Sequence, residues 1–188
     1  MHRIVVGVTG ASGMPLAEKL LRHYAGLKDL EVHLIVSGGA EVVMQSEFRG
    51  SDLSLKKHVH TVHDIKDMTA GPSSGSWQHD GMIICPCSMS SLASIACGAG
   101  VNLIHRAADV SLKERKKLVI VPRETPLTMI HLRNMQTLTE AGAVIAPFCP
   151  AYYDSRTTID DMMQHFAGRL LDQLRIENSL CARWRDNK

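Results

Sequence analysis

The chain has 188 residues, 45% of them hydrophobic, and a formal net charge of +2 when its histidines are neutral. This length and apolar fraction are typical of one domain with a sizeable core, and the charge is too balanced to indicate binding to nucleic acid or to an anionic membrane. Because no stretch reaches the roughly 18 apolar residues of a membrane-spanning helix and no signal-peptide pattern is present, we expect a single cytoplasmic domain over residues 1–188.

Apolar strand patterns alternate with helical patterns along the chain. The predicted strands cover Arg3–Thr9, Glu31–Val36, Gly81–Cys85, Leu118–Val121 and Val144–Ala146, with room for one short strand near His58–Val62. The predicted helices cover Pro15–Tyr24, Ala40–Phe48, Met89–Cys97, Ala107–Arg115 and Thr158–Leu174. Strands separated by helices predict an α/β fold, in which a parallel sheet lies between two layers of helices.

Turns that carry hydroxyl groups follow three of the predicted strands. They contain Ser12 in the turn Gly10-Ala11-Ser12-Gly13, Ser37, and the run Ser88–Ser91. Ligands of open α/β sheets bind at the carboxyl ends of the strands, where glycines and helix N-termini can approach a phosphate. The first turn alone fits an ordinary strand–helix connection equally well, and Ser90 or Ser91 could simply cap a helix. The recurrence favours one polar crevice for flavin mononucleotide or another nucleotide.

Charged side chains surround the strand predicted at Leu118–Val121. Arg123 and Glu124 lie at its carboxyl end, where they suggest a phosphate ligand and an acid/base group, although an isolated pair would more often be a solvated turn. Arg106, Asp109 and Lys113 are spaced to share one face of the preceding helix, a pattern usually found on exposed helices with salt bridges. Tyr153 and Arg169, taken alone, could be surface or core residues.

The five cysteines do not predict a metal site. Their odd number, without an export signal, indicates reduced thiols. Cys85-Pro86-Cys87 lacks the CxxC spacing of zinc sites and has no second Cys/His pair. We interpret these cysteines as structural.

Together, these segments resemble the UbiX family of flavin prenyltransferases, formerly described as small subunits of aromatic acid decarboxylases. The similarity extends from Val5 to Trp184, and the run from Arg106 to Met135 is its most specific part. The residues that carry it are Gly10–Gly13, Ser74–Ser76, Pro86–Met89, Arg106–Val110, Leu112–Arg115, Arg123–Leu127, Ile130–Leu132, Asn134–Met135, Pro150–Tyr153 and Ile159–Asp161.

The resemblance implies a flavodoxin-like or Rossmann-like three-layer flavoprotein and a homo-oligomer, a dodecamer with sites between subunits. It implies transfer of a dimethylallyl group from dimethylallyl phosphate to N5 and C6 of reduced FMN. The product, prenylated FMN, would serve a partner UbiD-type decarboxylase. The family needs no metal, and the chain has no DDxxD-type magnesium motif.

The resemblance also assigns the site residues. FMN would contact Gly10, Ala11, Ser12, Ser37, Ser88, Met89, Ser90, Ser91 and Arg123. The prenyl phosphate would contact Ser74, Gly75, Ser76, Arg106, Lys113, Tyr153 and Arg169. Ser12 would relay a proton near N5, Glu47 would border the reacting edge of the flavin, Lys113 would bind the leaving phosphate, and Glu124 would shuttle its proton. The expelled phosphate is a candidate base for the C6 proton.

The chain departs from the family pattern around the rim of this site. Gly38 replaces a common lysine, and the loop before Ser74 lacks the aromatic residue that often walls the prenyl site. Trp77 or Trp184 could replace that wall, and the sequence does not decide between them. The other departures are Phe148, Tyr152 and Arg156.

Two other functions remain open from the sequence. An FMN-dependent cysteine decarboxylase would share the fold, but it carries a PASANT-type segment where this chain has Pro86–Ser91, and a catalytic histidine that has no counterpart here. A non-catalytic FMN-binding subunit of a decarboxylase would have no need of a second phosphate site. The charged residues at Lys113, Glu124 and Arg169 therefore argue against it.

Overall fold

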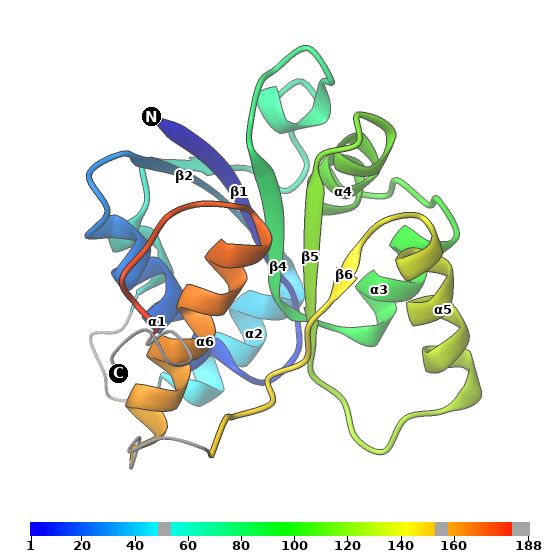
Figure 1. The fold of residues 1–188 in the computed structure, drawn as a ribbon. Coiled ribbons are helices and arrows are strands. Elements are labelled where there is room, and N and C mark those ends of the chain that lie inside the picture. Colours follow the sequence, from blue (N-terminus) through cyan, green and yellow to red (C-terminus); the bar gives the residue numbers. More distant parts are fainter. Residues whose placement is uncertain (49–53, 153–157, 182–188) are drawn as a thin grey trace.

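The computed structural model describes residues 1–48, 54–152 and 158–181, and its strands form one parallel sheet (Figure 1). The strands are β1 (His2–Val8), β2 (Leu30–Val36), β3 (Thr61–His63), β4 (Gly81–Cys87), β5 (Lys117–Pro122) and β6 (Val144–Ile145). Their spatial order is β3-β2-β1-β4-β5-β6, and every neighbouring pair is parallel. This is the doubly wound order of Rossmann-type sheets, which confirms the predicted fold class.

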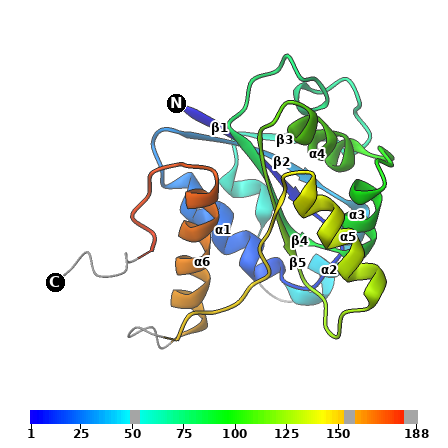
Figure 2. The ribbon, with the colours of Figure 1, turned by 45° about the vertical axis from the view of Figure 1, so that its right-hand side comes forward.

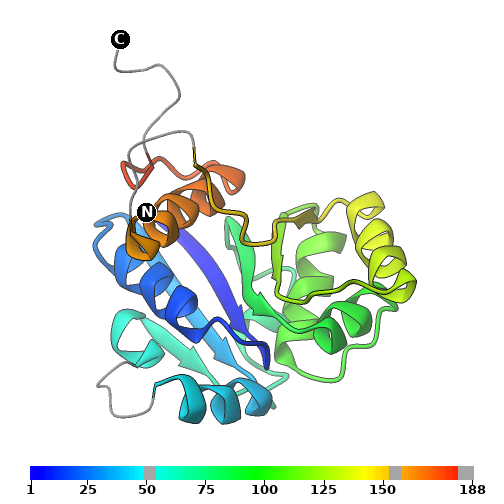
Figure 3. The ribbon, with the colours of Figure 1, turned by 90° about the horizontal axis from the view of Figure 1, so that it is seen from below.

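Helices cover both faces of the sheet, as Figures 2 and 3 show. Helices α1 (Met14–Ala25), α2 (Gly38–Glu47) and α6 (Ile159–Gln173) lie on one face, and α3 (Met89–Ala96), α4 (Leu103–Lys113) and α5 (Met129–Glu140) lie on the other. Two short 3₁₀ helices, η1 (Leu55–His58) and η2 (Gly71–Ser73), interrupt the connections on either side of β3. None of the helices in the described ranges is long and apolar enough to span a membrane.

Alternate residues of each central strand enter two separate cores. In β1, Ile4 and Val6 pack with α1 and α6, whereas Val5 packs with α3 and α4. Because both faces are covered, nearly every residue of β4 and β5 is buried. Strands buried on both faces appear in a sequence as continuous apolar runs, which is why these strands were predicted within a few residues of their observed bounds.

Two helices on the second face differ from the prediction. Helix α4 begins at Leu103 rather than Ala107, because the side chain of Asn102 caps it by accepting the His105 N–H at 3.0 Å. Helix α5 was not predicted. Only Leu138 of its residues is buried, so its sequence lacks the apolar stripe on which helix prediction depends.

Candidate functional site

Apart from Tyr153 and Arg169, the predicted site residues fall into two groups at opposite edges of the sheet. The carboxyl-edge cluster consists of Gly10–Ser12, Ser37, Glu47, Ser88–Ser91, Arg123 and Glu124. The amino-edge cluster consists of Ser74, Gly75, Ser76, Arg106 and Lys113. Lys113 comes just before β5 and Arg123 just after it, and this strand, Lys117–Pro122, spans roughly 20 Å. A single chain therefore does not bring the two clusters together.

The carboxyl-edge cluster surrounds the point where the strand order reverses, between β1 and β4. Buried Thr9, at the end of β1, joins the two loops there: its hydroxyl accepts the Ser88 N–H at 2.7 Å and donates to the Pro86 carbonyl at 3.1 Å. A Cβ atom on Gly10 would lie 3.0 Å from the carbonyl carbon of Gly39, so glycine allows the first turn to pack on the start of α2. In doubly wound folds this reversal point is where ligands bind.

Serine side chains cap the helices that begin at this edge. The Ser37 hydroxyl accepts the Ala40 N–H at 3.1 Å, and the Ser88 hydroxyl accepts the Ser91 N–H at 3.3 Å. The capping role thus belongs to Ser37 and Ser88 rather than to Ser90 or Ser91. Each capping hydroxyl keeps its own proton to donate, and the first N–H groups of α2 and α3 have no acceptor inside their helices. This edge therefore offers several donors to a phosphate.

The carboxylate of Glu47 lies at the N-terminus of α1, where it accepts the N–H groups of Gly13 at 3.0 Å and Met14 at 2.8 Å. It replaces a capping side chain, which the N-cap Gly13 cannot supply. Burial alone would raise the pKa of Glu47, but hydrogen bonds from Ser12 and from these two N–H groups, together with the Arg123 charge, lower it overall. Glu47 is therefore ionised at neutral pH.

Arg123 connects the loop after β5 to the loop after β1. Its Nε donates to the Ser12 carbonyl at 3.2 Å, and the rest of its guanidinium is exposed. Glu124 beside it is also exposed, and its carboxylate accepts the Thr125 N–H at 3.1 Å. Arg123 thus keeps guanidinium N–H donors for an anion, and the exposed carboxylate of Glu124 lies beside it.

A cavity of about 290 Å³ opens at this edge. Its polar side is formed by Ser12, Glu47 and Arg123, which come from three different loops or helix ends. The remaining lining residues are Gly13, Pro15, Leu16, Pro86, Val121, Pro122, Phe148 and Met163. A mostly apolar wall with a few convergent polar groups is the usual form of a small-molecule site. It suits a flavin, whose ring needs apolar contacts while its phosphate needs the N–H groups and Arg123.

Arg169 lines a second cavity of about 460 Å³, formed by the loop Cys149–Tyr152 and by helix α6. Chain neighbours line the two cavities: Phe148 and Met163 line the first, and Cys149 and Met162 line the second. Arg169 is held by Asp172 at 2.7 Å. Tyr153, predicted to bind the same phosphate, lies outside the described residues, as do Arg156 and Trp184.

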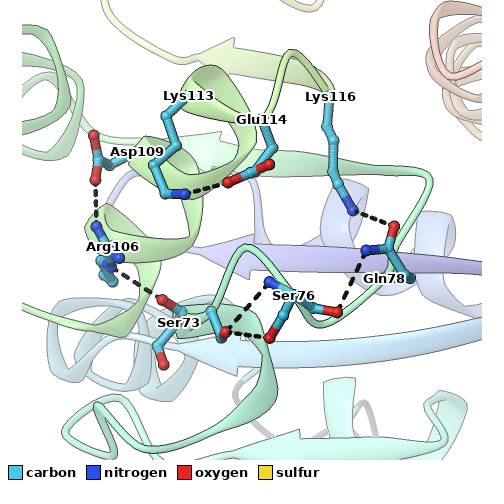
Figure 4. Close-up of polar contacts among 9 residues, drawn as sticks. Ser73, Ser76, Gln78, Arg106, Asp109, Lys113, Glu114 and Lys116 are labelled. Atoms are coloured by element: carbon cyan, nitrogen blue, oxygen red, sulfur yellow. Dashed lines mark hydrogen bonds and ion pairs between the residues drawn. The ribbon is translucent and has the colours of Figure 1, made fainter.

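The amino-edge cluster is a set of exposed polar contacts between the loop after η2 and helix α4 (Figure 4). Arg106 donates to the Ser73 carbonyl at 3.0 Å and pairs with Asp109 at 2.6 Å. Lys113 pairs with its neighbour Glu114, not with Asp109, and this contact lowers the pKa of Glu114. The hydroxyls of Ser74 and Ser76 lie 2.9 Å apart. Two cations and two hydroxyls at one place form a plausible phosphate site.

Three features of these clusters were not predicted from the sequence. Thr9 and Glu114 had no expected role, although a hydroxyl at the end of a buried strand was a usable signal for Thr9. Trp77, a candidate wall of the prenyl site, packs against His33 and His79 beneath the amino-edge loop. Among the described residues, no group of three or more His, Cys, Asp or Glu side chains is arranged to hold a metal ion.

Known proteins are similar to this chain over nearly its whole length. The flavoprotein family model matches residues 1–170. The flavin prenyltransferase LpdB of Lactiplantibacillus plantarum is 45% identical over 184 residues, which cover 98% of each protein.

Two solved structures are similar over nearly the whole chain. AnUbiX (PadA1), described in complex with FMN and dimethylallyl pyrophosphate, is 44% identical with a TM-score of 0.92, covering 100% of this chain and 99% of that one. A dodecameric FMN-dependent UbiX-like decarboxylase from Escherichia coli O157:H7 is 42% identical with a TM-score of 0.91, covering 97% and 99%. With this identity over its whole length, the chain belongs to the UbiX-like flavin prenyltransferase family of flavoproteins.

Proposed function

We propose that this chain transfers a dimethylallyl group from dimethylallyl phosphate to reduced FMN. The observation that carries the proposal is the cavity at the reversal point of the sheet, where Ser12, Glu47 and Arg123 meet an apolar wall. The similar AnUbiX is described with FMN and a dimethylallyl compound bound, which supports the same pair of ligands here. Reduced FMN would supply N5 and C6: the N–C bond at N5 would replace the C–O bond to phosphate and the N5 proton. Ring closure at C6 would release the C6 proton while the double bond of the prenyl unit takes up a proton.

The carboxyl-edge cluster would hold the flavin. The first turns of α2 and α3 present N–H groups to the flavin phosphate, and Arg123 adds a cation beside them. Ser37 caps α2, and Ser88–Ser91 form the start of α3. Gly10 and Ala11 form the turn after β1, which packs on the start of α2. Ser91 is buried and already bonded through its N–H to Ser88, and its predicted contact is therefore the least direct.

Ser12 and Glu47 would manage a proton at the reacting edge. The Ser12 hydroxyl is hydrogen-bonded to Glu47, whose carboxylate is kept ionised by its donors. A proton leaving N5 can pass through Ser12 toward this carboxylate, which is already oriented by Gly13 and Met14. The lowered pKa makes Glu47 a transient proton carrier rather than a lasting acceptor.

The amino-edge cluster would bind the phosphate of the prenyl donor. Lys113 and Arg106 stabilise the charge that develops as phosphate leaves, and the serine hydroxyls donate to its oxygens. Glu124, Arg169 and Tyr153 would meet the same phosphate from the other side, with Glu124 taking up or returning its proton. Because the two clusters lie at opposite edges of the sheet in one chain, they can share a substrate only if they come from different chains.

We therefore place the site between copies in a dodecamer. The similar Escherichia coli protein is described as dodecameric. The start of α5 exposes Met129 (62%), Ile130 (68%) and Leu132 (44%) beside Leu127 (42%), an apolar group that assembly would cover. Prenylated FMN would then pass to a UbiD-type decarboxylase, as the family resemblance implies.

One experiment tests the reaction. The protein is incubated without oxygen with reduced FMN and dimethylallyl phosphate, and the flavin is examined by mass spectrometry and absorption. We expect a five-carbon adduct, formed at least tenfold more slowly by the Glu124→Gln variant because the acid beside the phosphate is lost. Flavin that binds but never gains the five-carbon unit would contradict the proposal.

That outcome would favour a second function, a non-catalytic FMN-binding subunit of an aromatic acid decarboxylase. The observation in its favour is that the similar Escherichia coli protein is described as a decarboxylase. Added aromatic acid and a partner decarboxylase, with no prenyl donor, would then suffice for carbon dioxide release.

A further inference from the structure

The loop that carries Ser74 and Ser76 is anchored by the residue that follows it, Trp77. The backbone N–H of Trp77 donates to the Ser74 carbonyl at 3.2 Å, which closes the loop into a turn. The half-buried indole packs against the core on the face of the sheet that α3 and α4 cover. Trp77 is thus the point where an exposed loop joins the buried part of the molecule.

The indole is enclosed on several sides. His33 meets it edge-on with ring centroids 4.8 Å apart, and the guanidinium of Arg3 lies 4.9 Å from its ring centre. At the entrance to the loop, a Cβ atom on Gly71 would lie only 2.7 Å from Nε1 of Trp77. The indole therefore rests directly on the Gly71 backbone, and it holds the beginning and the end of the loop together.

The residues around the indole are themselves held. His33 Nε2 lies 3.0 Å from Glu31, and Glu31 accepts a hydrogen bond from Arg3 at 2.9 Å. Since a carboxylate only accepts, Nε2 of His33 carries the proton, and its Nδ1 accepts from His63 Nε2 at 2.8 Å. Burial lowers the pKa of His33 despite Glu31, so the ring is neutral at pH 7. This chain of contacts fixes the rotamer of His33 and gives Trp77 one place to lie.

The loop has little freedom on its outer side. A Cβ atom on Gly75 would lie 2.7 Å from Nζ of Lys113 and would also meet Glu114. A small displacement of the loop would therefore change the distance between the serine hydroxyls and Lys113. Misplacement of a binding group by about 1 Å can cost roughly a hundredfold in rate.

We propose that Trp77 is a positioning residue for the prenyl phosphate: its indole, clamped by His33, Arg3 and Gly71, sets Ser74 and Ser76 beside Lys113. The inference rests on the proposed function, because it takes the amino-edge cluster as the phosphate site. Trp77 itself touches neither the phosphate nor the flavin. Its effect should appear in binding of the prenyl donor, not in flavin binding.

The test measures steady-state prenyl transfer by the assembled protein, with dimethylallyl phosphate varied at saturating reduced FMN. We expect Trp77→Leu to raise KM for dimethylallyl phosphate about tenfold with kcat and the Kd of FMN nearly unchanged, the pattern of lost substrate binding. Trp77→Phe, which keeps an aromatic ring, should restore most of the affinity. Gly71→Ala adds the Cβ atom that displaces the indole, and it should raise KM as well even if Trp77→Leu folds poorly.

Two controls separate the possible failures. Ile95→Ala weakens the same core at α3, away from the loop, and should lower stability without changing KM. Arg106→Gln tests the phosphate site itself. An unchanged KM in Arg106→Gln would overturn the phosphate assignment and the inference together. A raised KM in Arg106→Gln with no change in Trp77→Leu and Gly71→Ala would overturn the inference alone, as would an equal loss of FMN affinity in the Trp77 variants.

Discussion

The two edges of the sheet carry polar groups of different origin. At the carboxyl edge, the donors are mainly backbone N–H groups in the glycine turn and at the starts of α2 and α3, and the side chains of Ser37, Ser88 and Glu47 serve as caps. At the amino edge, the groups are side chains in exposed ion pairs, such as Lys113 with Glu114. A backbone site is in place once the sheet has formed, whereas a side-chain site depends on its neighbours for position.

The distinction between the two edges requires that they bind different ligands. We expect Arg123→Gln to raise the Kd of reduced FMN by about ten- to a hundredfold, because a charged hydrogen bond contributes roughly 1.5–3 kcal/mol. Lys113→Gln should leave that Kd unchanged and raise KM for dimethylallyl phosphate by a similar factor. Anaerobic flavin titration and steady-state kinetics measure the two constants. Both variants changing the same constant would contradict the division.

Co-expression of the two variants extends this test to the assembly. If each site takes one edge from each of two chains, random mixing gives intact pairs at one site in four, so activity should recover to roughly a quarter of the unsubstituted level. Each variant alone would remain far lower. Co-expressed variants with no more activity than their average would show that both edges act within one chain.

Acid should affect the two edges in different pH ranges. At the amino edge, burial, together with the charge of Lys116, lowers the pKa of His79 to about 4. Below pH 6.5 the unfolded chain thus binds more protons than the folded chain. The stabilisation that neutral His79 allows is fully present above pH 6.5 and is lost as pH falls toward 4, with a slope of up to about 1.4 kcal/mol per pH unit. His79→Gln, which can still donate to the Gly81 carbonyl, should flatten this slope in urea unfolding between pH 7 and 5. An identical slope would exclude His79 as its source.

The carboxyl edge should respond at lower pH and more weakly. The folded-state pKa of Glu47 lies below its ordinary value of 4.5, so the stabilisation is present above pH 4.5 and is lost as pH falls through the folded-state value. Glu47→Gln removes the charge at the start of α1 and should cost about 0.5–1 kcal/mol at pH 7. The difference should vanish in acid. Glu140→Gln, an exposed change on α5, is the matched control, and an equal effect there would remove the special role of Glu47.

Much of the fold could be predicted because its strands are buried on both faces. The run Leu118–Val121 of β5 is apolar throughout, and the turns that follow β1, β2 and β4 contain the hydroxyls of the flavin site. Helix α5 could not be predicted in this way, because only Leu138 of its residues is buried. The place of Trp77 depends on His33 and Arg3, which are distant in sequence, and no local pattern encodes such contacts.

The separation of the site residues into two edges could, in contrast, be predicted from their order in the chain. Lys113 precedes β5 and Arg123 follows it, and in a parallel sheet the two ends of a strand point to opposite edges. Family resemblance assigns Lys113 and Glu124 to one phosphate and places the sites between subunits. Strand direction gives the physical reason, because one chain cannot bring both residues to the same edge.

The exposure of α5 has a consequence for local opening of the chain. A helix with one buried side chain, Leu138, gains little from packing, and the capping box of Thr128 and His131 supplies only local support. Amide protons in α5 of an isolated chain would exchange with solvent much faster than those of β4, which opens only on global unfolding. The boundary of the cooperative folding unit in a lone chain would then run between α5 and the sheet.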